Sequence, residues 1–171
     1  MARSIGIVVA AAVVALGGGA AAGESATALR GNVAPPTLGL LHEGPSARLV
    51  RIDPALHVQP GASLDVGSNT FAWSVSPDGS TLALGGDRDG AFVPEVLLVE
   101  APTLRALGRV RLAPRGWIVA TGWLRRGTLS AVVSAEDVAV VTVDAKRRSV
   151  VARRSLPWQV LHVAHGRDVL V

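Results

Sequence analysis

The segment SPDGSTLALGGDRDGAFVPEVLLVEAPT, from Ser76 to Thr103, decides the fold because it joins a tight corner to two short apolar runs. Pro77 fixes φ, Asp78 can bond the neighbouring backbone, and Gly79 accepts the positive φ that closes a corner. The two apolar runs that follow are too short for helices and predict β-strands. The segment therefore predicts a turn, a strand, a loop and a second strand, in this order.

The same corner holds serine and aspartate side chains of the kind that hydrolases use. A catalytic serine needs a base within hydrogen-bond reach, and a Gly-x-Ser-x-Gly elbow does not occur here. The histidines lie in other parts of the sequence, at His42, His57, His162 and His165. We therefore interpret the corner as a turn and not as an active site.

Three segments repeat one pattern, an apolar strand that ends at an acidic residue before a turn. They are LVRIDPALHV from Leu49, VLLVEAPTLRAL from Val96 and AVVTVDAKRRSV from Ala139, with acidic residues at Asp53, Glu100 and Asp144. Between them lie segments that read strand, tight turn, strand, around Gly79, Gly127 and Gly166. A period of roughly 40 to 48 residues with four short strands is typical of β-propeller blades, which bury one another's faces.

The segment from Ser76 to Thr103 resembles the repeat of TolB-type, WD-repeat-like or YVTN-like, bacterial β-propellers. It shares with them a Ser-Pro-Asp-Gly corner, an apolar strand, an Asp-Arg-Asp-Gly hairpin and a strand with an acidic end. The segment from Trp117 to Pro157 has LRRG instead of that corner and is similar only loosely. The resemblance implies an all-β propeller of four-stranded antiparallel blades, a fold that hosts binding proteins as well as enzymes.

The repeats predict how the chain is divided. A linker and lead-in segment over residues 29–48 is expected to precede a partial propeller over residues 49–171. The expected blades cover residues 49–70, 71–116, 117–157 and 158–171, the first and last being partial. Because closed propellers have four to eight blades, we expect the chain to be a fragment of a longer protein. An open array of blades and an oligomer that closes the ring are the alternatives.

Residues 1–28 predict a secretory signal peptide. Arg3 precedes an apolar run from Ile5 to Leu16, and no charged residue occurs from Ser4 to Gly23. Small residues at 20–22 and 26–28 suit a signal peptidase. An uncleaved membrane anchor is the alternative, because about 20 uncharged residues can just span a bilayer. In both cases we expect an extracytoplasmic protein of the cell envelope, secreted or periplasmic.

The composition excludes several chemistries. The chain has no cysteine, so it forms no disulfide and has no thiol nucleophile. Residues 101–171 hold 12 basic and 4 acidic side chains, and the basic groups Arg125-Arg126, 146–148 and Arg153-Arg154 lie near predicted turns. Because no aromatic residues are interleaved with them, as nucleic-acid stacking requires, we predict solvated turns and no nucleic-acid partner.

Candidate ligand sites are few. Asp87 and Asp89 resemble the first part of a calcium loop whose later ligands are missing, and His162 and His165 would point to opposite faces of a strand. The acidic residues at the strand ends are Asp53, Glu100 and Asp144. They could line a common rim of the blades and hold a metal, or they could be polar residues that precede turns. The tryptophans are predicted to pack between blades, with a ligand-stacking surface as the alternative: Trp73, Trp117, Trp123 and Trp158.

From these patterns we predict no catalytic residue, cofactor or metal ligand. The favoured function is a non-catalytic binding scaffold in the cell envelope, with a protein, peptide or glycan as its partner. Membrane contact is expected only through an uncleaved signal peptide, and an oligomer only if the chain is complete. The alternative is the propeller part of an extracytoplasmic enzyme, such as a lactonase, a quinone-dependent dehydrogenase or a peptidase, whose catalytic residues lie beyond this chain.

Overall fold

The computed structural model describes residues 37–43, 46–53, 55, 57–67, 69–87, 90–125 and 127–157. The predicted signal peptide and the predicted start of a further blade at 158–171 lie outside these residues, as do the His162 and His165 pair and Trp158. No helix in the described part of the chain is long and apolar enough to cross a membrane.

The described residues form β-strands joined by turns and loops. The strands are β1 (Thr37–Glu43), β2 (Ser46–Ile52), β3 (Val58–Gly67), β4 (Asn69–Val75), β5 (Thr81–Asp87), β6 (Glu95–Glu100), β7 (Arg105–Arg111), β8 (Trp117–Arg125), β9 (Thr128–Ser134), β10 (Val138–Asp144) and β11 (Ser149–Leu156). All pairings between them are antiparallel. The all-β prediction is therefore confirmed.

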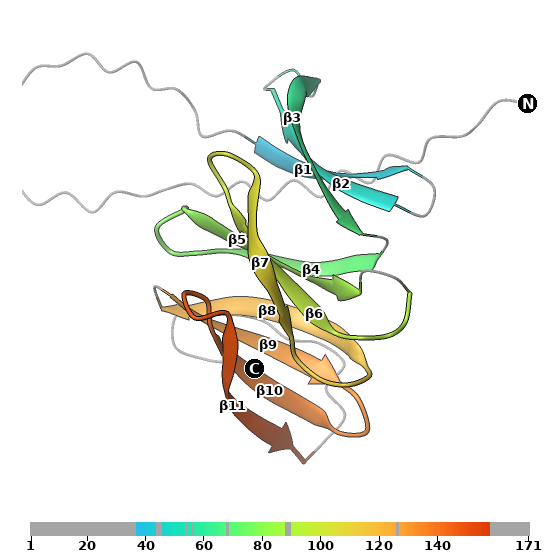
Figure 1. The fold of residues 1–171 in the computed structure, drawn as a ribbon, viewed down its shortest axis with the longest axis vertical. Coiled ribbons are helices and arrows are strands. Elements are labelled where there is room, and N and C mark those ends of the chain that lie inside the picture. Colours follow the sequence, from blue (N-terminus) through green and yellow to red (C-terminus); the bar gives the residue numbers. More distant parts are fainter. Residues whose placement is uncertain are drawn as a thin grey trace, which may run out of the picture.

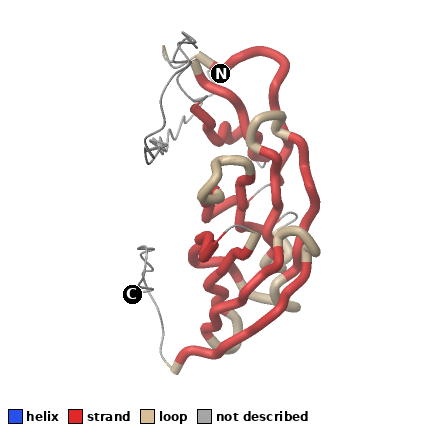
Figure 2. Tube along the Cα trace, turned by 90° about the vertical axis from the view of Figure 1, so that its left-hand side faces the viewer, coloured by secondary structure: helices blue, strands red, loops and turns tan. Residues whose placement is uncertain are grey.

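The strands form three sheets that lie one above the other (Figures 1 and 2). The first sheet has the order β1-β2-β3, the second β4-β5-β6-β7 and the third β8-β9-β10-β11. Strands β4 and β8 make the closest contact between the second and third sheets, whereas β7 and β11 touch only slightly. The sheets therefore diverge from their first strand to their fourth, and the described sheets do not close into a ring.

The first sheet begins earlier than the sequence analysis predicted. Strand β1 lies inside the expected linker at 29–48 and pairs with β2 along its whole length, from Thr37 opposite Ile52 to Glu43 opposite Ser46. The pairing explains the difference, since an apolar run that finds a partner strand can satisfy its backbone groups in a sheet. Strand β2, like β6 and β10, is followed by or ends at an acidic residue of the repeat. Because β6 and β10 are the third strands of their sheets, β1, β2 and β3 correspond to the second, third and fourth strands of the other two sheets.

The second sheet is buried on both faces. Side chains of a strand alternate between its two faces, and here each face meets a neighbouring sheet. Leu82, Leu84, Leu97 and Val99 belong to the apolar cluster shared with the first sheet. Ala83, Val96 and Leu98 belong to the cluster shared with the third. This double burial explains why β5 and β6 read as continuous apolar runs instead of alternating ones.

Arginine side chains join the outer strands of successive sheets. Arg109 of β7 donates to the backbone oxygen of Val66 in β3 at 3.4 Å. Arg148, in the turn after β10, donates to the backbone oxygen of Leu107 in β7 at 2.8 Å. The second and third sheets thus each contact the last strand of the sheet before them through a guanidinium group.

The corner between β4 and β5 closes through backbone and side-chain hydrogen bonds. The Gly79 amide donates to the Ser76 oxygen at 2.8 Å, and Gly79 has a φ of 70°. Asp78 Oδ1 accepts from the Ser76 hydroxyl at 2.6 Å and from the hydroxyl and amide of Ser80 at 2.7 and 3.1 Å. The hydroxyls of this corner are therefore engaged in the turn itself.

The buried contact between the second and third sheets generates a test of the fold. Leu98 is fully buried in the shared cluster, so Leu98→Ala should lower the free energy of unfolding by about 3 kcal/mol through lost burial and the cavity left behind. Val151→Ala on the exposed strand β11 is the control and should change it by less than about 0.5 kcal/mol. Urea denaturation measures both, and equal effects would contradict the shared core.

Candidate binding site between two sheets

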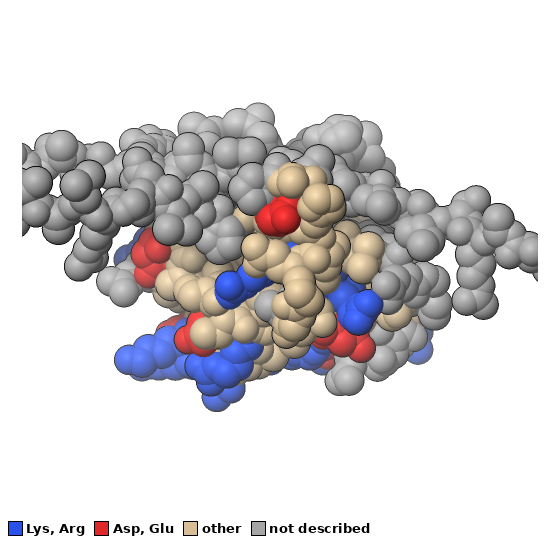
Figure 3. Space-filling model, turned by 90° about the horizontal axis from the view of Figure 1, so that it is seen from above, with Lys and Arg blue, Asp and Glu red and all other residues tan. Residues whose placement is uncertain are grey.

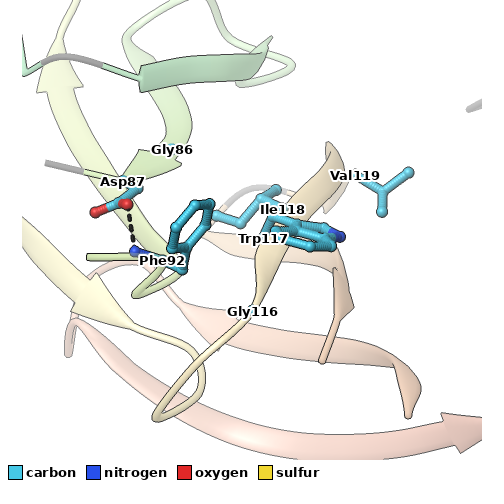
Figure 4. A pocket seen from close by; sticks show the side chains of 7 residues that line it. All are labelled: Gly86, Asp87, Phe92, Gly116, Trp117, Ile118 and Val119. Atoms are coloured by element: carbon cyan, nitrogen blue, oxygen red, sulfur yellow. Dashed lines mark hydrogen bonds between the residues drawn. The ribbon is translucent and has the colours of Figure 1, made fainter. Parts of the chain in front are cut away.

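A hollow of about 290 Å³ lies where the loop from β5 to β6 meets the loop from β7 to β8 (Figure 4). Its lining comes from both loops and from the strand ends beside them: Gly86, Asp87, Phe92, Gly116, Trp117, Ile118 and Val119. The second and third sheets both contribute to this lining. The hollow therefore depends on the packing of two sheets against each other.

Phe92 is held in a backbone conformation that aromatic residues rarely adopt. Its φ is 55°, and a left-handed conformation in a bulky residue costs about 1–3 kcal/mol unless its surroundings enforce it. The Phe92 amide donates to Asp87 Oδ2 at 2.5 Å, and the Phe92 carbonyl accepts from the Gly116 amide at 2.7 Å. The amide of Phe92 is thus fixed by the end of β5 and its carbonyl by the loop from β7 to β8, while the side chain remains 59% exposed.

Trp117 stands beside Phe92 on the first residue of β8. The two ring centroids are 5.8 Å apart, with an angle of 74° between the planes, which is an edge-to-face pair. Trp117 is 55% exposed, although large aromatic side chains usually bury most of their surface. The pair therefore presents two ordered apolar surfaces to solvent next to the hollow.

Gly116 is required by the backbone that forms the floor of the hollow. Its φ is 126°, and a Cβ atom built there would lie 2.3 Å from the backbone oxygen of Ser134. Ser134 ends β9 and pairs with Trp117 in the sheet, so its oxygen cannot move without loss of that pairing. A side chain at position 116 would consequently displace the loop that orders Phe92.

We compared the sequence and the fold with those of known proteins. No family model matches the sequence, and a search of curated proteins found no match. Among solved structures, the hydrazine synthase of Kuenenia stuttgartiensis has a TM-score of 0.57 and 16% identity over 72% of this chain and 34% of its own. A structure of RRP9 WD40 repeats has a TM-score of 0.51 and 19% identity over 70% of this chain and 35% of its own.

A third similar structure is the β-propeller domain of the Trilobed protease from Pyrococcus furiosus. Its TM-score is 0.50, with 14% identity over 78% of this chain and 42% of its own. The chain has a β-propeller fold. At these identities the likeness concerns the fold alone, and the chain spans less than half the length of each of these neighbours. The finer resemblance to TolB-type repeats stays a prediction.

The three sheets are accordingly blades 1, 2 and 3. The hollow lies between blades 2 and 3, at the loops that join β5 to β6 and β7 to β8. Strand β6 begins at Glu95 near the hollow and ends at Glu100. Glu100 therefore lies at the opposite end of the blade, away from the aromatic pair.

The acidic residues predicted to share a rim each belong to a separate turn. Asp53 Oδ1 accepts from the His57 amide at 2.8 Å, and this hydrogen bond holds the pKa of Asp53 below its usual value. Hydrogen bonds from Arg105 and then Thr103 lower the pKa of Glu100, and Asp144 Oδ1 accepts from the Arg147 amide at 2.8 Å. Within the described ranges, no three His, Cys, Asp or Glu residues gather where they could hold a metal.

The other candidate residues are distributed as follows. Asp87 lies at the hollow, whereas Asp89 and the side chain of His42 lie outside the described residues. Trp73 packs against the cluster between blades 1 and 2, and Trp123 against the cluster between blades 2 and 3. Trp117 differs from both because it faces solvent. The sequence analysis did not predict a role for Phe92. The signal for it was a bulky aromatic residue in a predicted loop, two residues before Pro94.

The described basic residues of the second half are divided between blades 2 and 3, and in Figure 3 the largest group of Lys and Arg side chains lies at the lower left, with others at the centre and right. Lys146, Arg147 and Arg148 occupy the turn after β10, but Arg153 and Arg154 lie within β11 and not at a turn, which corrects the prediction. The structure pairs several of them locally, since Arg153 binds Asp137 at 2.6 Å and Arg147 lies 3.8 Å from Asp144. These contacts reduce the charge available to a polyanion.

The first site prediction concerns the floor of the hollow. Gly116→Ala should lower the free energy of unfolding by at least about 2 kcal/mol, because positive φ and the contact with Ser134 oppose a Cβ atom. Gly127→Ala is the matched control, with a φ of 77° and open space around the new atom, and should cost about 1 kcal/mol. Thermal or urea unfolding compares them, and a smaller effect at 116 than at 127 would rule out the steric argument.

The second prediction concerns Asp137 in the turn between β9 and β10. Hydrogen bonds from Ser155 and Arg153 hold the pKa of Asp137 below its usual value. The contacts therefore stabilise the fold above the unfolded-state pKa, and this stabilisation is lost as the pH falls through the lower folded-state pKa. Arg153→Gln should raise the Asp137 pKa in an NMR titration of the carboxyl carbon. An unchanged titration curve would show that Arg153 makes no contribution.

Proposed function

We propose that the chain is a non-catalytic binding protein of the cell envelope whose β-propeller recognises a protein partner at the aromatic site between blades 2 and 3. The observation that carries this proposal is the exposed Phe92 and Trp117 pair beside an apolar hollow. Aromatic residues that anchor in desolvated pockets dominate the binding energy of many protein interfaces.

The backbone around Phe92 supports a binding role. The hydrogen bonds from its amide and to its carbonyl order the loop before any partner arrives. Binding to an ordered loop avoids the entropy cost of fixing it, so more of the contact energy becomes affinity. A strained and exposed aromatic residue stabilises no core, which makes a contact with another molecule the better explanation of its conformation.

The expected export of the protein is supported by the sequence of residues 1–28, with its basic start, apolar centre and small-residue exit. When the full chain is expressed in a bacterial host that secretes proteins, mass spectrometry of the exported protein should find its first residue after Ala22 or after Ala28. Recovery of the protein in the cytoplasm with an intact first residue would refute the export proposal.

Site-specific photo-crosslinking tests the binding role. A photo-reactive amino acid in place of Val119, which lines the hollow, should link the full chain to one envelope protein in living cells. The same amino acid in place of Val151, on the outer strand β11, should not produce this adduct. The adduct should disappear when Phe92→Ala is combined with the reactive residue at 119.

Two results would contradict the proposed function. Adducts that form equally from positions 119 and 151 would indicate unspecific contact with the surface. An adduct that persists in the Phe92→Ala variant would show that the partner does not depend on the aromatic pair.

A further inference from the structure

We propose that the hollow between blades 2 and 3 takes one bulky apolar side chain of an acidic peptide segment in the partner protein. This inference rests on the proposed function and adds the chemistry of the ligand. Three observations carry it: the size of the hollow, the character of its lining and the charges of the loop that borders it.

The size and lining of the hollow suit a single apolar side chain. Its volume of about 290 Å³ lies at the lower limit of pockets that enclose whole small molecules. The lining consists of aromatic and aliphatic side chains and the backbone of Gly86 and Gly116. Asp87, the one titratable side chain among the described lining residues, already accepts the Phe92 amide. A sugar or nucleotide would leave its polar groups without partners on these walls, whereas an apolar side chain would not.

The loop from β7 to β8 adds positive charge beside the hollow. Arg111 donates to the backbone oxygens of Ala113 and Pro114 at 3.2 and 2.9 Å, and so braces this loop. Both acceptors are uncharged, so the guanidinium keeps its positive charge. Arg115 is exposed and lies directly before Gly116.

Two carboxylates of the strands beside the hollow, Asp87 and Glu95, are already engaged in the fold. Asp87 is buried beneath Phe92, and Glu95 lies 3.9 Å from Arg109. The exposed charge of the loop from β7 to β8 is positive, because Arg115 is exposed there and Asp87 beside the hollow is buried. Carboxylates beside the anchoring side chain would therefore be attracted, and lysines at the same places repelled.

The experiment uses the full chain in its exported form, labelled with 15N, and three synthetic heptapeptides. The first has a central Phe between two Glu residues and Gly-Ser ends, the second has Ala in place of Phe, and the third has Lys in place of Glu. The first peptide should bind at least about tenfold more tightly than either of the others. Its saturable NMR shifts should centre on the amides of Phe92 and Gly116 and on the indole of Trp117.

Two variants and a control examine the same contacts. Phe92→Ala should weaken binding of the first peptide by about tenfold or more, as expected for an aromatic anchor. Arg115→Glu, a change at an exposed position, should reverse the preference between the Glu and Lys peptides. Val58→Ala, on an exposed residue of β3 in blade 1, should change neither affinity nor preference.

The outcomes separate this inference from the proposed function. Equal affinity for the Glu and Lys peptides, or shifts that centre elsewhere, would overturn the acidic ligand. Failure of all three peptides together with a Phe92-dependent adduct in cells would overturn this inference and leave the proposed function in place. Tight binding of the first peptide without any cellular adduct would support the ligand chemistry and refute the proposed function.

Discussion

Burial of both faces of blade 2 is the interaction on which the rest of the structure depends. A four-stranded sheet exposes two apolar faces, and among the described residues the turns and salt bridges are too small to cover either of them. Blade 1 covers the face of Leu82 and Leu97, and blade 3 covers the face of Val96 and Leu98. Since burial of apolar surface contributes about 25 cal/mol per Å², stacking of the blades is the main source of stability. Arginine contacts at the outer strands add directional links between them.

The candidate binding site is a consequence of this stacking. The strands must turn at the end of each blade, and there the loop of blade 2 meets the loop that leads into blade 3. Asp87 ends a strand of blade 2, and Gly116 precedes the first strand of blade 3. Together they fix the peptide of Phe92 from two sides. The aromatic pair is ordered because the packed core holds the two blades, and with them the two loops, in place.

Local features of the fold could be predicted because their causes are local. The corner at Ser76–Gly79 follows from proline, aspartate and glycine in the right order, and the strands follow from short apolar runs between turns. The strand at 37–43 was missed because its sequence is ambiguous until β2 pairs with it. The acidic strand ends look like a shared site in the repeat, but each carboxylate bonds within its own turn. Repetition in sequence placed each of them at the same position of its own blade.

The sequence by itself determined an all-β chain with repeated strands and tight corners, because these depend on neighbouring residues and on a period that can be counted. Only the tertiary structure decided which aromatic residues are buried. Trp73 and Trp123 pack on the cores between blades, while Trp117 and Phe92 face solvent. Whether an aromatic side chain is exposed depends on how the neighbouring blades pack, and this packing is set by contacts between residues far apart in the chain. For this reason the candidate site became visible only once the blades were placed against each other.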